Sequence, residues 1–539
     1  MRVVADQDVC FELYRGERLS RPLRYTNQAF SWLERISRHR TAMCVFVMAT
    51  TMALRIALLP RIPVPQPRVP DEFAYLLGGE TFAAGRLTNP AHPMWRHFET
   101  LMELSQPTYM SKYPPGQSLF LAIGYKLGHP WLGVWISFGL FAACLCWMLQ
   151  NWVPPVYALL GTAITVARIS VLGYWMNSYW GGTVAASAGC LFLGALPRLA
   201  YRVKPTDVLL ASLSLVVLAN TRPYEGLVMS VAAVVALVFW RVRRKRTLAE
   251  FVSMRCVLVL VVVFGAGAFW YAYYNHRVTG HALRMPYAAY FEQYQMASPW
   301  IFLPAQAPPI YRHADLRNTW EKQNEEFERK RAHPISNLKE LFSIFDFFCS
   351  PLFLFPAMLA LLLSRSYRLW TAAVILVCAW FGLIIESVRA PHYVAGSVGL
   401  FALLAVYGLR WLRVIGKTYG PVVVLTLVGI MCLQGRASEQ GQSWETRRIS
   451  PRMIATQEVM KHSGRHLILV RYSPDHIDRG DECVYNAADI DASQIVWARD
   501  MGEAKNQELI DYYRGSRKVW LYQPDTDPAE LIPYESVHQ

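Results

Sequence analysis

The sequence lacks the cysteine spacings of a disulfide framework or of a metal site. Most of its ten cysteines stand inside apolar runs, where a thiol behaves as a small hydrophobic group. Cys349 and Cys483 are too isolated to suggest a pair or a metal site. The cysteines therefore imply no redox chemistry.

Other common signatures are missing too. The sequence has no internal repeat or low-complexity segment, and its polar C-terminal part has no Gly-rich phosphate loop, so no nucleotide site is predicted. The first forty residues are polar and Arg-rich, without the apolar core and cleavage site of a removable signal peptide. We therefore expect the first apolar segment to direct membrane insertion.

Charge is scarce and unbalanced. Charged residues make up only 17% of the chain, and Lys and Arg (54) outnumber Asp and Glu (39), giving a formal net charge of +15. The basic residues stand in short clusters between apolar runs rather than on one soluble face, which argues against nucleic-acid binding. With 53% hydrophobic residues, 18 Trp and 28 Tyr, the composition predicts an α-helical polytopic membrane protein.

Eleven apolar segments are long enough to be candidate membrane spans. They lie at about residues 41–59, 131–149, 155–172, 182–200, 206–221, 224–240, 253–275, 342–363, 368–386, 392–411 and 419–434. Segment 116–128 is apolar but too short to cross, so we expect it to be re-entrant or interfacial. We also expect a short interfacial helix at 73–84 and a charged helix near 318–331.

The composition of the loops predicts their orientation. Alternate loops carry the Lys and Arg clusters that mark the cytoplasmic side, and only the 150–154 turn is neutral. The loops assigned to the outside, 173–182, 221–226 and 387–393, are rich in aromatic, Pro, Gly and polar residues. The Arg-rich N-terminus is therefore predicted to be cytoplasmic, and the odd number of spans places the C-terminus outside.

Three regions follow from this layout. Residues 1–40 form a cytoplasmic segment, residues 41–436 a transmembrane domain with long outer loops at 61–130 and 276–341, and residues 437–539 an extracytoplasmic α/β domain. The last region has helical patterns at 453–462 and 503–514 and strand patterns at 466–472, 495–498 and 517–522. That order predicts a small parallel sheet with covering helices, which we expect to fold on its own.

An acid pair stands just after the first span. Asp71 and Glu72 lie near the boundary of a medium that strongly disfavours charge, so they call for a partner or a function, although a solvated loop that merely starts with acids explains them equally simply. The histidines of the outer side lack metal-ligand spacing, so we expect no cofactor, and a divalent metal bound with the acid pair is the less favoured alternative. These histidines are His92, His97, His276 and His392.

Arginines also occur at the outer boundaries of the membrane, a side usually poor in them. Arg222, Arg277 and Arg389 could surround one cleft and bind a phosphate, because the guanidinium presents a rigid fork of donors. Local ion pairs are the alternative, for example Arg222 with Glu225, or Arg389 with the acid three residues before it.

The sequence allows two roles for each of two further basic residues. We expect Arg55, late in the first span, to reach the interface or pair locally. Lys112 precedes Tyr113-Pro114-Pro115 and either contacts a phosphate or stands in a loop whose prolines only fix its path. The aromatic loop 173–182 could stack a sugar, although interfacial Trp and Tyr usually act as membrane anchors.

Four motifs together resemble those of a known superfamily. They are Asp71-Glu72 after the first span, Lys112-Tyr113-Pro114-Pro115 before the second, Thr221-Arg222-Pro223-Tyr224-Glu225-Gly226 between later spans, and Arg389-Ala390-Pro391-His392-Tyr393 opening a late span. This layout resembles the GT-C superfamily of integral-membrane glycosyltransferases over about residues 41–411. It is most similar to the bacterial branch with protein O-mannosyltransferase-like, aminoarabinose-transferase-like and rhizobial galacturonosyltransferase-like proteins.

The resemblance implies a function. Such enzymes transfer a sugar from a polyprenyl-phosphate donor to a lipid, glycan or protein acceptor at the outer face of the bacterial inner membrane, and the acid of the first outer loop is catalytic. That role falls on Asp71, with Glu72 beside it. Many members carry a second acid after the third span, whereas this chain reads Asn177-Ser178-Tyr179-Trp180-Gly181-Gly182.

The remaining site residues are assigned by side-chain chemistry and by their place in these motifs. Candidates for binding the donor phosphate are Arg222, Arg389, Lys112, Arg277 and His392. Candidates for binding the acceptor or sugar are Tyr113, Asn177, Tyr179, Trp180, Glu225 and Tyr393. Two other classes stay open: a lipid or solute transporter, for which we expect polar groups near mid-span in matching halves, and a non-catalytic cell-envelope assembly protein.

The orientation can be tested by labelling. Single cysteines introduced at Arg244 and Lys417 should react with a membrane-impermeant thiol reagent only from the cytoplasm, and cysteines at Gln106, Asn318 and Asp489 only from outside, because the basic clusters alternate sides. Labelling of Lys417 from outside, or of Asp489 from inside, would overturn the eleven-span topology.

Overall fold

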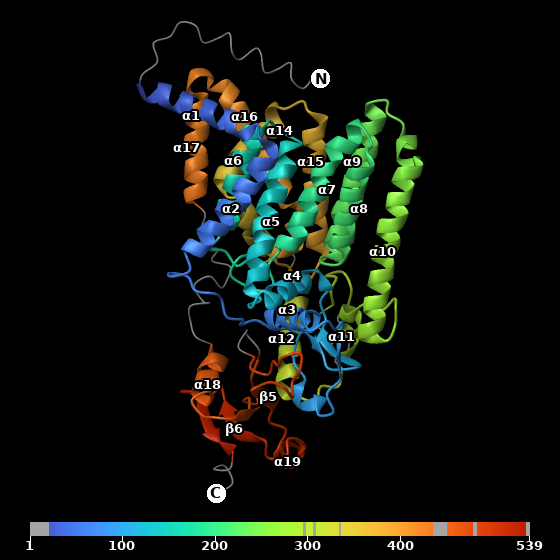
Figure 1. The fold of residues 1–539 in the computed structure, drawn as a ribbon, viewed down its shortest axis with the longest axis vertical. Helices are drawn as coiled ribbons and strands as arrows, with labels where there is room; N and C mark the ends of the chain where they lie inside the picture. The colour runs from blue at the N-terminus through green and yellow to red at the C-terminus, as the bar shows by residue number, and fades with distance from the viewer. Residues whose placement is uncertain are drawn as a thin grey trace.

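The computed structural model describes residues 21–294, 298–304, 309–333, 336–434, 450–477 and 482–534. A long bundle of helices forms one part of the molecule, and a small α/β domain near the C-terminus forms the other (Figure 1). A layer of short helices and strands lies between the two. The predicted fold class, a helical polytopic protein with a C-terminal α/β domain, is confirmed.

Each of the eleven predicted apolar segments is helical. The helices of the bundle are α2 (Arg40–Ala57), α5 (Trp131–Gln150), α6 (Pro155–Ile169), α7 (Thr183–Tyr201), α8 (Pro205–Ala219), α9 (Pro223–Arg243), α10 (Met254–Thr279), α13 (Ser336–Phe348), α14 (Pro351–Leu363), α15 (Tyr367–Ile385), α16 (Val398–Ile415) and α17 (Gly420–Leu433). The short 3-10 helix η5 (Pro391–Ser397) leads directly into α16. The amphipathic helix α1 (Arg21–Ser37) lies across the end of the bundle near the N-terminus (Figure 1).

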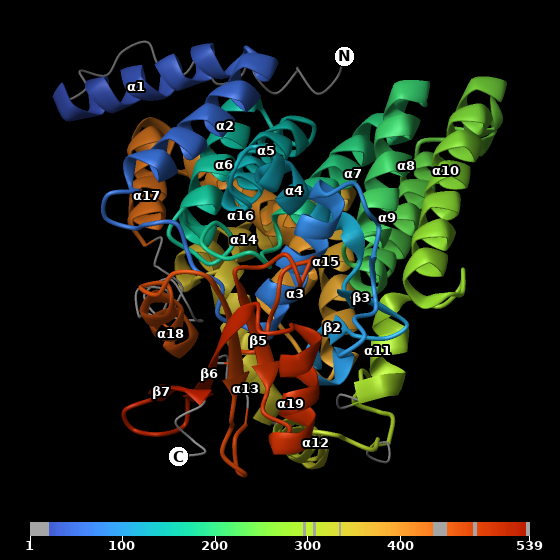
Figure 2. The same cartoon turned by 60° about the horizontal axis from the view of Figure 1, so that its bottom comes forward.

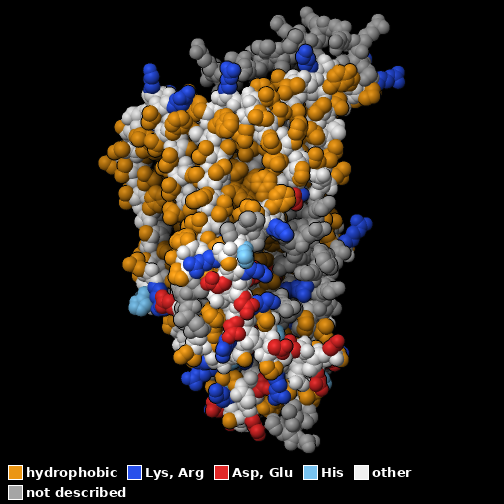
Figure 3. All heavy atoms as spheres, turned by 180° about the vertical axis from the view of Figure 1, so that it is seen from behind, with side chains coloured by type: hydrophobic (Ala, Val, Ile, Leu, Met, Phe, Trp, Pro, Cys, Tyr) orange, Lys and Arg blue, Asp and Glu red, His pale blue; other side chains and the backbone are white. Residues whose placement is uncertain are grey.

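Among the described residues, the helices differ in whether they could cross a membrane. Seven are long and apolar enough, and α13 with α14 would add an eighth as a broken span bent by 85°. The apolar helices at 155–169, 205–219 and 417–433 are shorter. The count of eleven crossings therefore stays a prediction. On the face seen in Figure 3, hydrophobic side chains cover most of the bundle, and most acidic side chains lie toward the end of the molecule that holds the C-terminal domain.

Proline sets the starts of many helices. Pro155, Pro205, Pro223 and Pro351 each occupy the first turn of a helix, where the missing N–H costs no hydrogen bond and the fixed φ angle suits a helix. The loops therefore end where the sequence places these prolines. For α9, this puts Arg222 at the N-cap, at the end of the bundle that faces the C-terminal domain.

The middle layer is built from the two long outer loops. It contains α3 (Pro70–Ala83), α4 (Pro115–Lys126), α11 (Pro286–Tyr294), α12 (Ala314–Ala332) and a small antiparallel sheet of β1 (Asn89–Pro90), β3 (Thr108–Ser111) and β2 (Glu103–Leu104), in that order. The segment predicted to be re-entrant or interfacial is α4, which packs on α3 and on α5 at the end of the bundle. The helices predicted near 73–84 and 318–331 correspond to α3 and α12.

The C-terminal domain is a four-stranded sheet in the order β5-β4-β6-β7. Its strands are β4 (Arg465–Val470), β5 (Ile495–Arg499), β6 (Arg517–Gln523) and β7 (Glu530–Pro533), and its helices are α18 (Pro451–Val459) and α19 (Glu503–Tyr512). Strand β4 pairs in parallel with both β5 and β6, as predicted. Strand β7, which the sequence analysis missed, adds an antiparallel edge to β6.

The two faces of this sheet have different coverings (Figure 2). On one face, Ile468 and Val470 pack with residues of α18 in a core of the domain's own. On the other face, Leu467 and Leu469 pack with α19 and also with Leu77, Phe98 and Tyr109 of the middle layer. The domain therefore shares one of its cores with residues about four hundred positions earlier, and its folding on its own stays a prediction.

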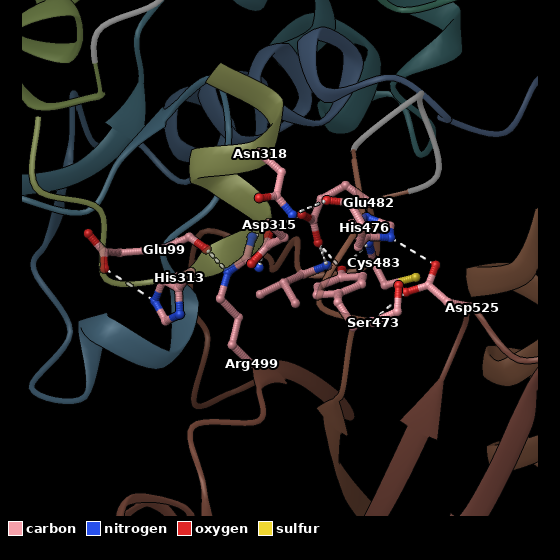
Figure 4. A network of polar contacts seen from close by, with 12 residues as sticks. Glu99, His313, Asp315, Asn318, Ser473, His476, Glu482, Cys483, Arg499 and Asp525 are labelled. Carbon is pink, nitrogen blue, oxygen red and sulfur yellow. Dashed lines mark hydrogen bonds and ion pairs between the residues drawn. The ribbon is translucent and has the colours of Figure 1, made fainter. Parts of the chain in front are cut away.

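A buried ionic cluster fixes this contact (Figure 4). Arg499 at the end of β5 is 2% exposed and forms ion pairs with Asp315 of α12 and, at 2.9 Å, with Glu482. Its Nε also donates to the backbone oxygen of Glu99 at 2.6 Å. Asn318, one turn further along α12, donates to the backbone oxygen of His476 at 3.1 Å. Helix α12 is therefore bound to the C-terminal domain at several points.

Replacing Arg499 with Gln should strongly destabilise this contact, because Asp315 and Glu482 would then be buried without a counter-charge. Breaking a buried pair in this way costs about 3 to 5 kcal/mol. Arg317→Gln is a matched control on α12, since its pair with Glu321 is exposed at both ends (66% and 45%) and should contribute at most about 1 kcal/mol. Thermal unfolding of the solubilised protein measures both, and equal losses for the two variants would contradict this account.

Candidate active site

Asp71 lies in the first turn of α3, at the end of the bundle that faces the C-terminal domain. Its Oδ1 accepts a hydrogen bond from the hydroxyl of Tyr113. The side chain is partly exposed, and no described residue binds Oδ2. One carboxylate oxygen is thus fixed by Tyr113, while the other can accept a hydrogen bond from a bound molecule.

Tyr113 is held in place from two sides. Its ring stacks on Tyr75, with ring centroids 4.5 Å apart and planes 16° from parallel. The chain after Tyr113 is anchored at Gly116, whose N–H donates to the backbone oxygen of Asn220 at 2.8 Å. A Cβ at Gly116 would lie 2.3 Å from Cγ2 of Thr221, so only glycine allows this approach. The contact brings the Lys112–Gly116 loop against the N-cap of α9, where Arg222 lies.

Arg222 has few bonding partners. Its guanidinium lies 4.5 Å from the ring centroid of Tyr393, and the nearest carboxylate, Glu225, is 3.8 Å away, which is beyond hydrogen-bond range. The guanidinium forms no hydrogen bond with any residue that the structure describes. Arg222, Glu225 and Tyr393 line one small cavity, and Tyr75 interacts electrostatically with both Arg222 and Asp71. Arg222 is therefore a partly buried cation that forms a long ion pair with Glu225, the local partner that the sequence suggested, and lies near the catalytic candidate.

Lys112 has a different environment from the one expected of a phosphate ligand. The side chain is 2% exposed, and its ammonium lies 5.0, 4.9 and 4.7 Å from the ring centroids of Tyr113, Tyr287 and Tyr290. Burial lowers the pKa of Lys112 to about 8, and attraction to Asp71 opposes that shift. Lys112 therefore supplies positive charge close to Asp71 from within an aromatic cage.

Glu386 is a site residue that the sequence analysis missed. As the acid three residues before Arg389, it was considered only as an ion-pair partner of that arginine. Burial, followed by repulsion from Glu225, raises the pKa of Glu386 to about 9, although Arg222 and Arg389 oppose this. Its Oε1 is buried without a hydrogen-bond partner among the described residues. A carboxyl group with this pKa is largely protonated at neutral pH and can donate a hydrogen bond.

The aromatic members of the site were also missed. Tyr75 and Tyr290 are buried, at 3% and 1% exposure, and the more exposed Tyr287 completes the aromatic surroundings of Lys112. For Tyr75 the sequence held a signal, because it lies four residues after Asp71 on a predicted helix and so shares its face. For Tyr287 and Tyr290 it held none, because α11 reaches the site only through the tertiary fold.

Glu72 is buried and bound by backbone N–H groups. It is 3% exposed, and its Oε2 accepts the N–H groups of Arg68 at 2.9 Å and Val69 at 3.3 Å, while Oε1 accepts the N–H of Tyr179 at 3.0 Å. Burial raises the pKa of Glu72 to about 7 despite these bonds. Glu72 therefore caps α3 and ties it to the aromatic loop, which agrees with a supporting place beside Asp71 rather than a role as the base.

Asn177 and Tyr179, predicted to bind the acceptor or sugar, use their polar groups in contacts within the fold, and that prediction stays untested. The amide of Asn177 accepts a hydrogen bond from Arg55 at 3.0 Å and donates to two backbone oxygens of its own loop at 2.9 Å. The hydroxyl of Tyr179 donates to the backbone oxygen of Pro65 at 2.9 Å. Arg55 itself is fully buried and also donates to the backbone oxygens of residues 62 and 63, so it holds the loops together as a local partner.

Two of the outer arginines differ from Arg222 in their surroundings. Arg389 donates to the backbone oxygens of Leu383 at 3.0 Å and Ile384 at 2.7 Å, and it forms an ion pair with Glu340 at 3.1 Å. Its donors thus cap α15 and bind α13, and its role as a phosphate ligand stays a prediction that these contacts do not favour. Arg277 is exposed near the end of α10 and contacts no residue of the Asp71 cluster among those described.

His392 and Trp180 lie next to each other at the edge of the site. Nδ1 of His392 is 3.0 Å from the hydroxyl of Tyr174, and the rings of His392 and Trp180 are 4.7 Å apart. Nε1 of Trp180 is buried without a partner among the described residues. These two residues keep their place as candidates for contact with a bound donor. In the described part of the chain, no group of three His, Cys, Asp or Glu side chains could hold a metal ion.

Glu72→Gln separates the structural acid from the catalytic one. A glutamine cannot accept all three N–H groups, because its NH₂ would face at least one of them, and losing such a charge-assisted bond costs about 1.5 to 3 kcal/mol. We expect a lower melting temperature for Glu72→Gln and an unchanged one for Asp71→Asn, whose amide oxygen still accepts from Tyr113. Equal melting temperatures for the wild type and Glu72→Gln would refute the structural role.

No protein-family model matches this sequence, and no curated protein matches it. Several solved structures are similar. ArnT from Cupriavidus metallidurans bound to undecaprenyl phosphate is 13% identical, with 88% of this chain and 92% of that chain covered and a TM-score of 0.47. The apo state of the same protein is 12% identical over the same shares, with a TM-score of 0.49.

The oligosaccharyltransferase of Archaeoglobus fulgidus in complex with Zn and sulfate is 10% identical, with 88% of this chain and 67% of that chain covered and a TM-score of 0.44. At these identities and TM-scores the similarity says nothing about a reaction, which has to be inferred from this chain's own residues.

Proposed function

We propose that this protein is a membrane glycosyltransferase that transfers a sugar from a polyprenyl-phosphate donor to an acceptor on the outer face of the membrane. The observation that carries the proposal is that Asp71, whose Oδ2 is open, and Arg222, a partly buried cation with only a long 3.8 Å ion pair to Glu225, both interact with Tyr75. A base for an acceptor hydroxyl and a cation for a leaving phosphate are the two groups that such a transfer requires.

Arg222 is suited to the donor phosphate. A guanidinium matches the geometry of phosphate oxygens and can bind two of them at once. The ring of Tyr393 lies under the guanidinium and limits its movement, and the ion pair with Glu225 is too long for a hydrogen bond, so the N–H donors can still bind phosphate oxygens. At the N-cap of α9, Arg222 also stands where a lipid phosphate at the bilayer surface would lie, with the lipid chain extending along the bundle.

Asp71 is suited to the acceptor. Oδ2 accepts the proton of the acceptor hydroxyl as that oxygen attacks the anomeric carbon, a new glycosidic bond forms, and the bond from the anomeric carbon to the phosphate oxygen breaks. The electron pair of that bond leaves with the polyprenyl phosphate, whose charge Arg222 balances. A single displacement of this kind inverts the configuration at the anomeric carbon.

The surrounding residues orient this pair. Tyr113 fixes the carboxylate of Asp71 through Oδ1, and Lys112 adds positive charge on the same side of the site. Glu386, largely protonated at neutral pH, can donate a hydrogen bond to a hydroxyl of the sugar or to the phosphate. The tyrosine rings around Lys112 offer flat apolar faces against which a sugar ring can pack.

Asp71→Asn tests the base. The variant keeps the shape and the hydrogen bond from Tyr113 but cannot take a proton, so turnover of a polyprenyl-phosphate sugar should fall about a hundred- to ten-thousand-fold while donor binding is kept. Asp475→Asn, an exposed aspartate of the C-terminal domain, is the matched control and should keep full turnover. Near-normal turnover by a folded Asp71→Asn variant would rule out Asp71 as the base.

Arg222→Gln tests the phosphate contact. Losing a charge-assisted bond costs about 1.5 to 3 kcal/mol, so the affinity for polyprenyl phosphate without a sugar should fall by about tenfold or more. Arg277→Gln removes an exposed arginine from the same side of the bundle and should leave the affinity unchanged. If both variants lost affinity equally, the effect would reflect overall charge rather than a contact at Arg222.

A further inference from the structure

A groove lies between α5, α7 and α8, at the end of the bundle opposite to α3 and Asp71 (Figure 1). Its volume is about 420 Å³, which is within the range of small-molecule sites. Leu191, Leu209, Leu210 and Leu213 form its walls, and Leu209 and Leu213 are 44% and 50% exposed. The groove therefore opens toward the side of the bundle that faces lipid.

The groove runs from the membrane surface into one leaflet. Leu191 precedes Arg198 by two turns of α7, and Leu213 follows Thr206 by two turns of α8. At about 1.5 Å per residue, each wall extends about 10 Å along its helix. Half of the hydrocarbon core is about 15 Å thick, so the depth matches part of one acyl chain.

Trp147 forms the floor of the groove. Trp147 of α5 lies flat against α7 at Gly194, where a Cβ would be only 2.4 Å from Cζ3 of the indole. Any larger residue at position 194 would push the ring into the groove. At the rim, the guanidinium of Arg198 lies 5.6 Å from the centroid of the same ring. The floor and the rim are thus held by one aromatic side chain.

The rim carries excess positive charge. Arg198 is paired with Asp207 at 2.7 Å, and Asp207 is buried while Arg198 remains 40% exposed. Arg202 and Lys204, in the turn between α7 and α8, are exposed and make no ion pair with a described residue. Glu250 accepts the backbone N–H of Val203 in the same turn but is paired with Arg241, so the cations still exceed the carboxylates of Asp207 and Glu250, and Thr206 lines the same groove.

We propose that this groove binds an anionic phospholipid, with one acyl chain between the leucine walls and the phosphodiester at Arg198, Arg202, Lys204 and Thr206. The groove is apolar and extends into one leaflet, and its rim has a net positive charge. A molecule with an apolar chain and an anionic head fits both features. Because the groove lies at the far end of the bundle from Asp71, this lipid is a bound component of the fold and not the sugar donor.

Native mass spectrometry of the solubilised full chain tests the proposal with three probes. Dioctanoyl phosphatidylglycerol carries both chain and negative charge, dioctanoyl phosphatidylcholine carries the chain without net charge, and glycerol phosphate carries the charge without the chain. We expect saturable binding of phosphatidylglycerol, at least about tenfold weaker binding of phosphatidylcholine, and no binding of glycerol phosphate. Equal affinity for the two lipids would overturn the proposal.

Two variants locate the site while leaving the buried Arg198–Asp207 pair intact. Arg202→Gln with Lys204→Gln should weaken phosphatidylglycerol binding by about tenfold or more, because each basic residue near an anionic lipid contributes about 1 kcal/mol. Arg255→Gln with Arg365→Gln, which removes two exposed arginines of other loops at the same end of the bundle, is the matched control. A loss equal to that of the control would contradict the proposal.

Leu213→Trp fills the groove and should abolish phosphatidylglycerol binding, whereas Leu258→Trp on the lipid-facing side of α10 should not. Unchanged phosphatidylglycerol binding by a Leu213→Trp variant with wild-type melting temperature would also overturn the proposal.

Discussion

The carboxylate of Glu72 connects the two segments on which the candidate site depends. It accepts backbone N–H groups from the start of α3 and from Tyr179, so it fixes α3 against the loop between α6 and α7. Asp71 precedes it by one residue and can point into the site only because this neighbour is bound. An acid buried to 3% exposure with three N–H donors keeps its place without a counter-ion.

The middle layer connects the candidate site to the rest of the molecule. Gly116 holds the Tyr113 loop against Asn220 and Thr221. Tyr113 and Arg222, which are far apart in the sequence, therefore lie at the same site. On its other side, the layer completes a core of the C-terminal sheet and holds Arg499 between Asp315 and Glu482. The C-terminal domain therefore stabilises the loops around the site without contributing a residue to the Asp71 cluster among those described.

The fold was largely predictable because its signals are local. Apolar runs of about twenty residues, prolines in first turns and alternating strand patterns each depend on a few neighbouring residues, and the eleven segments and the parallel strands β4, β5 and β6 were found in this way. Strand β7 was missed because it is four residues long and follows a turn with little strand pattern.

The site was predictable only in part, because its residue roles depend on tertiary contacts. Asp71, Tyr113 and Arg222 were found from their motifs, and the structure brings them together. Arg389 has the same chemistry as Arg222, yet its donors bind α15 and Glu340, and no sequence signal separates the two. Glu386 shows the converse: its role follows from burial beside Glu225, which spacing alone does not reveal.

The central claim is that Asp71 and Arg222 act on a lipid-linked phosphate. The most direct measurement is mass-spectrometric identification of the lipid that co-purifies with the wild-type protein and with Arg222→Gln. The account predicts a polyprenyl phosphate or its sugar derivative with the wild type, and its loss or strong reduction with Arg222→Gln. Recovery of no polyprenyl lipid from the wild type, or of equal amounts from both proteins, would contradict it.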